Sequence, residues 1–144
     1  MDASITFHQL DLSYRFRGIR NIRKWLQLVV ESHDKEVGEL AIIFCSDNAL
    51  LELNRTALNH DYYTDIITFD HCVGDLVSGD LYISVDRVRE NAKNLGHSLR
   101  EEMLRVCVHG ILHLCGQGDK STEEEKTMRR KEDQWLKVFH VKPS

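Results

Sequence analysis

The sequence has few of the residues that interrupt secondary structure. Its 144 residues include one proline, Pro143 at the tail, and eight scattered glycines. It contains no glycine-rich or proline-rich linker, no internal repeat and no low-complexity tract. The length therefore suits one domain over residues 1–144, and a chain of this size buries most of its surface without a disulfide or a structural metal.

Paired cysteines and long hydrophobic runs are also missing. None of the four cysteines forms a CxxC pair, which favours a reducing, cytoplasmic environment. The N-terminus has no basic segment followed by an apolar one, so we expect no signal peptide. The longest uncharged run, residues 106–118, is too short to span a bilayer, and we expect no membrane association.

Basic residues are outnumbered by acidic ones, 19 to 23, but five of them are concentrated in one segment. The formal net charge of -4 argues against DNA and against bulk nucleic-acid binding, which needs a basic face. Residues 15–24 nevertheless carry five cations and no acid: Arg15, Arg17, Arg20, Arg23 and Lys24. This cluster is a candidate phosphate contact, although an exposed helix face without a binding role is the simpler interpretation.

Hydrophobic periodicity predicts an α+β fold. Alternating or β-branched segments predict about four strands, at residues 4–10, 39–46, 64–70 and 78–85. Helical spacing and capping residues predict about five helices, over residues 19–32, 48–58, 85–95, 98–115 and 121–138. The order of these elements favours a small mixed sheet packed under a mostly helical layer.

The fourth predicted helix carries two histidines in apolar surroundings. His109 and His113 are four residues apart, so they share a helix face and can bind one metal ion, as the HExxH motif does with zinc. Gly110 stands where that motif has its glutamate base, which disfavours a metallopeptidase. Glycine weakens a helix by about 1 kcal/mol relative to alanine, which makes sense where another backbone or a substrate comes close.

A catalytic zinc typically takes three protein ligands and a water. Gly116 and Gly118 allow the chain to reverse after the helix, and Asp119 is the first ligand-type side chain beyond them. We therefore predict one ion, held with its water by His109, His113 and Asp119.

The simpler alternative is that neither histidine binds a metal and that backbone carbonyls accept the hydrogen bonds of both imidazoles. An HxxxH spacing without further signals would favour this alternative. The apolar helix, the two glycines and the carboxylate together favour the metal. Cys107 and Cys115 lie on other helix faces, so neither is expected to be a ligand, and Cys107 is expected to be a core residue. Ligand types alone do not choose between Zn²⁺ and nickel or another divalent ion.

Residues 109–119, HGILHLCGQGD, resemble a known signature. The YbeY family of metal-dependent endoribonucleases has H-G-x-L-H-L-x-G-Y-D-H, with three histidines as ligands. The first eight positions fit and the last three do not, and Asp119 stands where the third histidine belongs. Residues 53–70, 79–84 and 96–110 resemble further family segments, and the match covers about residues 40–137.

The resemblance implies a central histidine helix beside a cleft, and zinc-dependent cleavage of single-stranded RNA. It also implies maturation of the 3′ end of small-subunit ribosomal RNA, a role in ribosome quality control, and the ribosome or its proteins as partners. Leu58 aligns with the family's cleft arginine, so Arg55, about one turn earlier, is the candidate catalytic replacement. A ribosome assembly factor with a structural metal is the alternative function.

Other side chains are weaker candidates for contacts with RNA. His60 and Lys120 could meet phosphate, and the two tyrosines of residues 61–63 could stack a base, although simple loop packing is the favoured interpretation.

A carboxylate in place of a third imidazole leaves a Zn²⁺ site at about +1 instead of +2, which predicts weaker phosphate attraction. Whether water or the ribose 2′-OH attacks stays open.

Overall fold

The sheet combines parallel and antiparallel strand pairs. This computed structural model describes residues 4–141 and contains β1 (Ser4–Gln9), β2 (Glu36–Cys45), β3 (Ile66–Asp70) and β4 (Leu76–Ser84). The strand order is β1-β2-β4-β3, with β1–β2 and β2–β4 parallel and β3–β4 an antiparallel hairpin. The predicted small mixed sheet is confirmed, and Pro143 lies outside the described residues.

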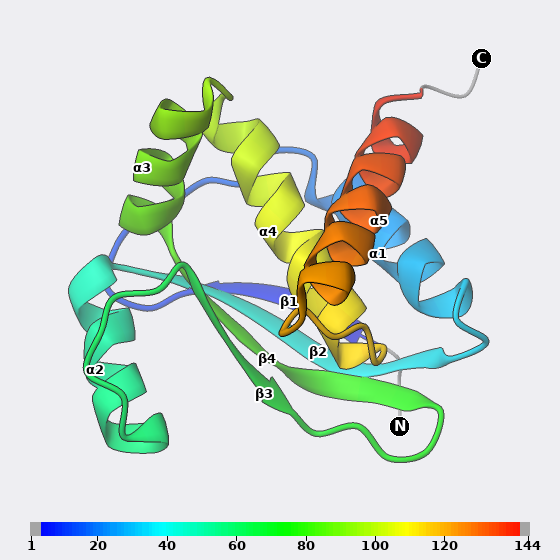
Figure 1. The fold of residues 1–144 in the computed structure, drawn as a ribbon, viewed down its shortest axis with the longest axis horizontal. Helices are drawn as coiled ribbons and strands as arrows, with labels where there is room; N and C mark the ends of the chain where they lie inside the picture. Colours follow the sequence, from blue (N-terminus) through cyan, green and yellow to red (C-terminus); the bar gives the residue numbers. More distant parts are fainter. Residues whose placement is uncertain (1–3, 142–144) are drawn as a thin grey trace.

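Five helices occupy both faces of this sheet (Figure 1). They are α1 (Ile19–Glu31), α2 (Asp47–Leu58), α3 (Val85–Leu95), α4 (Leu99–Leu114) and α5 (Thr122–His140). The main core lies between the sheet and the layer of α1, α4 and α5, and it includes Leu81 and Ile83 of β4. A smaller cluster with Leu50 and Ile67 lies under α2 on the opposite face. The predicted α+β fold with five helices is confirmed.

Tertiary pairing moves several predicted boundaries. β2 begins at Glu36 instead of residue 39, because Val37 pairs with Val77 ahead of a bulge. β3 begins at Ile66 instead of residue 64, and the two polar residues before it stay outside the ladder. Such shifts depend on the partner strand, which local pattern does not reveal.

The helix caps agree with the sequence, with one exception. At α5, Ser121 Oγ accepts from the backbone N–H of Glu124, whose carboxylate accepts from the N–H of Ser121. At α4, Ser98 Oγ accepts from Glu101 N–H. The Glu101 carboxylate binds His140 Nε2 at 2.7 Å instead of the N–H of Ser98, so only half of the capping box that Ser98 and Glu101 could form is present. The carboxylate thereby joins α4 to α5.

Gly110 lets α4 approach the sheet closely. A Cβ at this position would lie 2.3 Å from Leu81 Cδ2 and 2.9 Å from Ile66 Cδ1. The close neighbours predicted from the glycine are therefore side chains of β4 and β3, and neither another backbone nor a substrate. Within residues 4–141, no helix combines the length and apolar character that a membrane crossing requires.

The substitution Gly110→Ala should lower the free energy of unfolding by about 1–3 kcal/mol, because the added Cβ would overlap the side chain of the fully buried Leu81, which would have to shift. Urea unfolding measures this loss. Alanine's better helix propensity works against it by about 1 kcal/mol, and Ala57→Gly at an exposed site of α2 calibrates that effect. Unchanged stability of Gly110→Ala would show that the core has spare volume here.

Candidate metal centre and adjoining cavity

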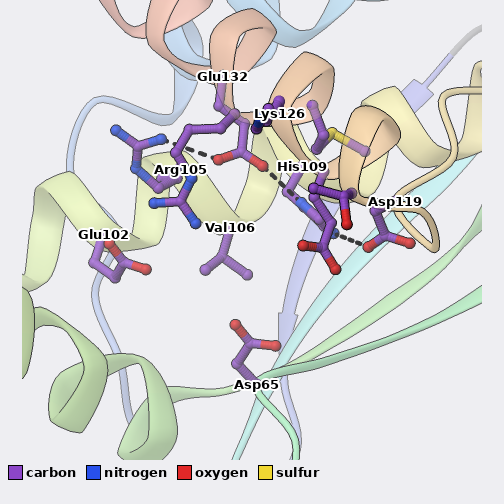
Figure 2. A pocket seen from close by; sticks show the side chains of 12 residues that line it. Asp65, Glu102, Arg105, Val106, His109, Asp119, Lys126 and Glu132 are labelled. Carbon is purple, nitrogen blue, oxygen red and sulfur yellow. Dashed lines mark hydrogen bonds and ion pairs between the residues drawn. The ribbon is translucent and has the colours of Figure 1, made fainter.

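One face of α4 is polar although most of the helix is buried. Glu102, Arg105 and His109 follow at intervals of three and four residues, so they share a face. With Val106 they line a cavity of about 530 Å³ between α4 and α5 (Figure 2). Asp65, just before β3, lies across the cavity from the helix.

Glu132 of α5 joins two members of this polar face. Its side chain is only 7% exposed. Oε1 accepts a hydrogen bond from Arg105 Nη1 at 3.0 Å, and Oε2 lies 2.7 Å from His109 Nδ1 (dashed lines in Figure 2). Arg105 also binds Asp133 through Nη2 at 2.8 Å. The buried carboxylate is therefore paired at both oxygens, as a buried charge requires.

The sequence analysis missed Glu132, although a signal was present. Met128 and Leu136 precede and follow it by four residues, and all three side chains are buried. An acid inside the apolar stripe of an amphipathic helix is uncommon unless a partner meets it. That interruption of the stripe marks Glu132 as a side chain with a specific role.

The structure brings His109 and Asp119 together. His109 Nε2 lies 3.4 Å from Asp119 Oδ2, while Nδ1 of the same ring faces Glu132. Two ligands of one tetrahedral Zn²⁺, each about 2.0 Å from the ion, are about 3.3 Å apart. This pair of atoms therefore has the spacing that a shared ion needs. Glu132 contacts the other ring nitrogen of His109, as a carboxylate commonly does where a histidine binds a metal.

His113 lies near His109 and Asp119 but is not close enough to complete a set of three metal ligands. It is exposed and lines a second cavity, of about 310 Å³, together with His109 and Asp119. Across residues 4–141, no three histidine, cysteine, aspartate or glutamate side chains converge closely enough to hold a metal ion. The structure thus assembles two of the three predicted ligands, and the complete set stays a prediction.

Burial and neighbouring charges shift the pKa of several groups here. Burial lowers the pKa of His109, but its hydrogen bond to Glu132 and the nearby carboxylates outweigh this and raise it above its usual value. Burial raises the pKa of Asp65, with the His109 charge opposing the effect. Burial also raises the pKa of Glu102, against the charge of Arg105. Several shifted groups around one cavity are typical of a functional site.

Arg55 is the predicted catalytic residue that the structure does not bring to either cavity. Its guanidinium is half exposed, donates to Asp61 Oδ1 at 2.5 Å and lies 3.5 Å from Glu52. Leu58, one turn later, lines the smaller cavity instead. The cations that line the larger cavity are ones the sequence analysis did not select: Arg105, Lys126 and Arg129.

The remaining candidates have different surroundings. His60 lines the smaller cavity and stacks on Tyr62, with ring centroids 5.2 Å apart. Tyr62 and Tyr63 are exposed, so the expected loop packing is incomplete. The cations of residues 15–24 are exposed, and two of them line a separate cavity beside β1. Lys120 is exposed beside Asp119, and Cys107 is a core residue as predicted.

The pair Arg105–Glu132 offers a stability test. Arg105→Leu should lower the free energy of unfolding by about 3 kcal/mol, because it leaves the buried Glu132 carboxylate without its cation. Chemical denaturation measures the change. Arg55→Leu is the matched control, since it breaks an exposed pair and should have little effect. Equal losses in both variants would show that Glu132 does not depend on Arg105.

The fold and the site define a class: small α+β enzymes in which a buried helix presents two histidines to a cavity beside a mixed sheet. The profile of the family described as Endoribonuclease YbeY matches residues 5–140. This chain belongs to that family, which confirms the resemblance seen in the sequence.

Two relatives named Endoribonuclease YbeY illustrate the similarity. The protein from Flavobacterium psychrophilum is 48% identical over 132 residues, covering 92% of this chain and 94% of that protein. The protein from Bacteroides thetaiotaomicron is 51% identical over 117 residues, covering 81% and 85%. The solution structure of TM1509 from Thermotoga maritima shares the fold, with a TM-score of 0.70, 26% identity, and coverage of 94% of this chain and 89% of that one.

Proposed function

We propose that this chain is a zinc-dependent endoribonuclease that cuts single-stranded RNA during maturation of the 3′ end of small-subunit ribosomal RNA and ribosome quality control. Membership of a family named for endoribonuclease activity supports the reaction. The observation that carries the site is the 3.4 Å separation of His109 Nε2 and Asp119 Oδ2 at the junction of two cavities.

His109, His113 and Asp119 would hold the ion. Glu132 holds the His109 ring through Nδ1, which leaves Nε2 as the ligand atom. His113 is exposed one helical turn away and lines the same cavity as His109 and Asp119, so its side chain would have to rotate to bring a second imidazole to the site. A bound Zn²⁺ supplies an acidified water and withdraws charge from a phosphate oxygen.

The two cavities suit a single strand that crosses the site. Asp65, His109 and Asp119 line both of them, so these residues stand between the two spaces. Volumes of about 530 and 310 Å³ accept separate nucleotides and are too small for a duplex. Lys126 and Arg129 line the larger cavity and are exposed, so they can meet phosphates next to the cut.

His113→Ala should reduce both zinc affinity and RNA cleavage by at least tenfold, since it removes one predicted ligand. Even the loss of a residue that only hydrogen-bonds to a ligand costs about 10–100-fold. Competition with a chromogenic chelator measures affinity, and a single-stranded RNA assay measures cleavage. His97→Ala, at an exposed histidine before α4, is the control. Cleavage that survives both chelation and His113→Ala would contradict the metal mechanism, whereas absence of any chelator-sensitive cleavage would favour the assembly-factor alternative.

Asp119→His tests the effect of the carboxylate on the same centre. The substitution raises the charge of the Zn²⁺ site from about +1 to about +2. The pH profile of cleavage should therefore move to lower pH, and the apparent affinity for RNA should increase. An unchanged profile, with zinc binding equal to that of the unsubstituted protein, would mean that Asp119 is not a ligand.

A further inference from the structure

We propose that Glu102, Val106 and Asp65 form a nucleobase pocket within the larger cavity, and that this pocket selects bases carrying an amino group over uracil. The inference rests on the proposed function, because it requires RNA at the His109–Asp119 centre. It assigns a specificity role to side chains outside the predicted ligand set.

The first observation is an unpartnered buried carboxylate. Glu102 is 5% exposed, and its side chain lines the cavity. Among the buried side-chain nitrogen and oxygen atoms of residues 4–141, Glu102 Oε1 alone has no hydrogen-bond partner. Buried acceptors in native proteins are normally satisfied, so such an exception calls for a donor that enters from outside.

The neighbours of Glu102 do not supply that donor. Arg105 is the nearest cation on the same helix face, but its Nη1 and Nη2 donate to Glu132 and Asp133. The buried residues that surround Glu102 in the sequence of α4 are apolar, beginning with Met103 and Leu104. Arg105 and His97 act on Glu102 only through their charge, and neither donates a hydrogen bond to Oε1.

The pocket's chemistry identifies what it accepts. Figure 2 shows Glu102 beside Val106 on α4 and Asp65 across the cavity from them, so an apolar surface adjoins two acceptor groups. A nucleobase has a flat apolar face and hydrogen-bonding edges, and an unpaired base is read along those edges. Carboxylates accept from amino groups, as they do from the N4 amino group of cytosine.

Uracil fits such a pocket poorly. Its Watson–Crick edge has a single N–H between two carbonyl oxygens, and those oxygens would face carboxylates. Cytosine, adenine and guanine each present an amino group on that edge. The pocket should therefore discriminate by the presence of the amino group, and a carboxylate pair that repels anions keeps phosphate out of this end.

The position of the pocket on α4 determines which base can enter it when a phosphate lies at His109 and Asp119. Glu102 lies two helical turns before His109 on the same face of α4. The cavity of about 530 Å³ runs between them and falls within the range of small-molecule sites. A nucleotide whose phosphate lies at His109 and Asp119 can place its base against Val106, while exposed Lys126 and Arg129 lie toward solvent.

A binding experiment tests the pocket without requiring catalysis. CMP, GMP, AMP and UMP are titrated separately into the zinc-loaded protein, and backbone amide shifts around Glu102 are followed by NMR. UMP should bind about tenfold more weakly than the other three, the discrimination expected of one good base contact. Equal affinity for all four nucleotides would overturn the proposal.

Glu102→Gln is the decisive variant. The amide of glutamine both donates and accepts, so it can face a uracil carbonyl as well as an amino group. The difference between UMP and the other nucleotides should shrink to less than about twofold. Glu101→Gln, the same change at the adjacent position, should keep the full difference, because Glu101 binds His140 and does not line the cavity. Retained selectivity in Glu102→Gln would refute the assignment.

Thermal unfolding separates recognition from a structural role. Removing an unpartnered buried charge should leave the melting temperature of Glu102→Gln unchanged or higher. A fall of several degrees together with lost selectivity would mean that Glu102 supports the fold, and it would overturn the proposal.

Cleavage of a randomised single-stranded RNA pool distinguishes failure of this inference from failure of the proposed function. Sequenced ends from the unsubstituted protein should show uracil depleted about tenfold at one position beside the cut, and Glu102→Gln should abolish the depletion. Cleavage without base preference overturns the pocket and leaves the endoribonuclease standing. Absence of zinc-dependent cleavage overturns the proposed function, and the nucleotide titrations then still decide whether the pocket selects bases.

Discussion

The buried carboxylate of Glu132 is the constraint on which the site depends. One oxygen binds Arg105 and the other binds His109, so α5 is fixed to α4 at the level of the predicted ligands. A buried acid is tolerated only where both oxygens have partners, and the same bonds that satisfy it orient the imidazole. Stability and ligand geometry are therefore two results of one interaction, and α5 is part of the centre although it carries no predicted ligand.

The packing of α4 explains why its polar face meets a cavity. Gly110 brings the helix against Leu81 and Ile66, so the sheet side of α4 is filled by apolar contacts. The polar stripe then faces α5, where Glu132 and the cavity lie. At the end of the helix, Gly116 adopts a positive φ of 105°, which glycine tolerates, and the chain turns so that Asp119 returns to His109.

Local patterns predicted most of the helices and strands, and they predicted one contact of the site, that between His109 and Asp119. Strand and helix periodicity gave the element types, and the glycine turn predicted that Asp119 would meet His109, because these signals lie within a few residues of one another. The roles of Glu132 and Glu102 were not predicted, since they depend on contacts between helices that sequence spacing does not describe. Arg55 was selected by alignment with a nearby position, but Asp61 binds it on the surface. Only the folded chain shows which cation reaches the cavity.

The balance of charge in the cavity has a consequence for RNA. Asp65, Glu102, Asp119 and Glu132 bring negative charge to a space whose inner cation, Arg105, is already bound to two acids. Such a site attracts a divalent cation and repels the phosphate backbone unless that cation is present. Positive side chains stand at the solvent side, where Lys126 and Arg129 are exposed. Under the proposed function, a divalent ion held at His109 and Asp119 would offset this excess of negative charge, so that an acidic protein could hold an anionic strand at this one place.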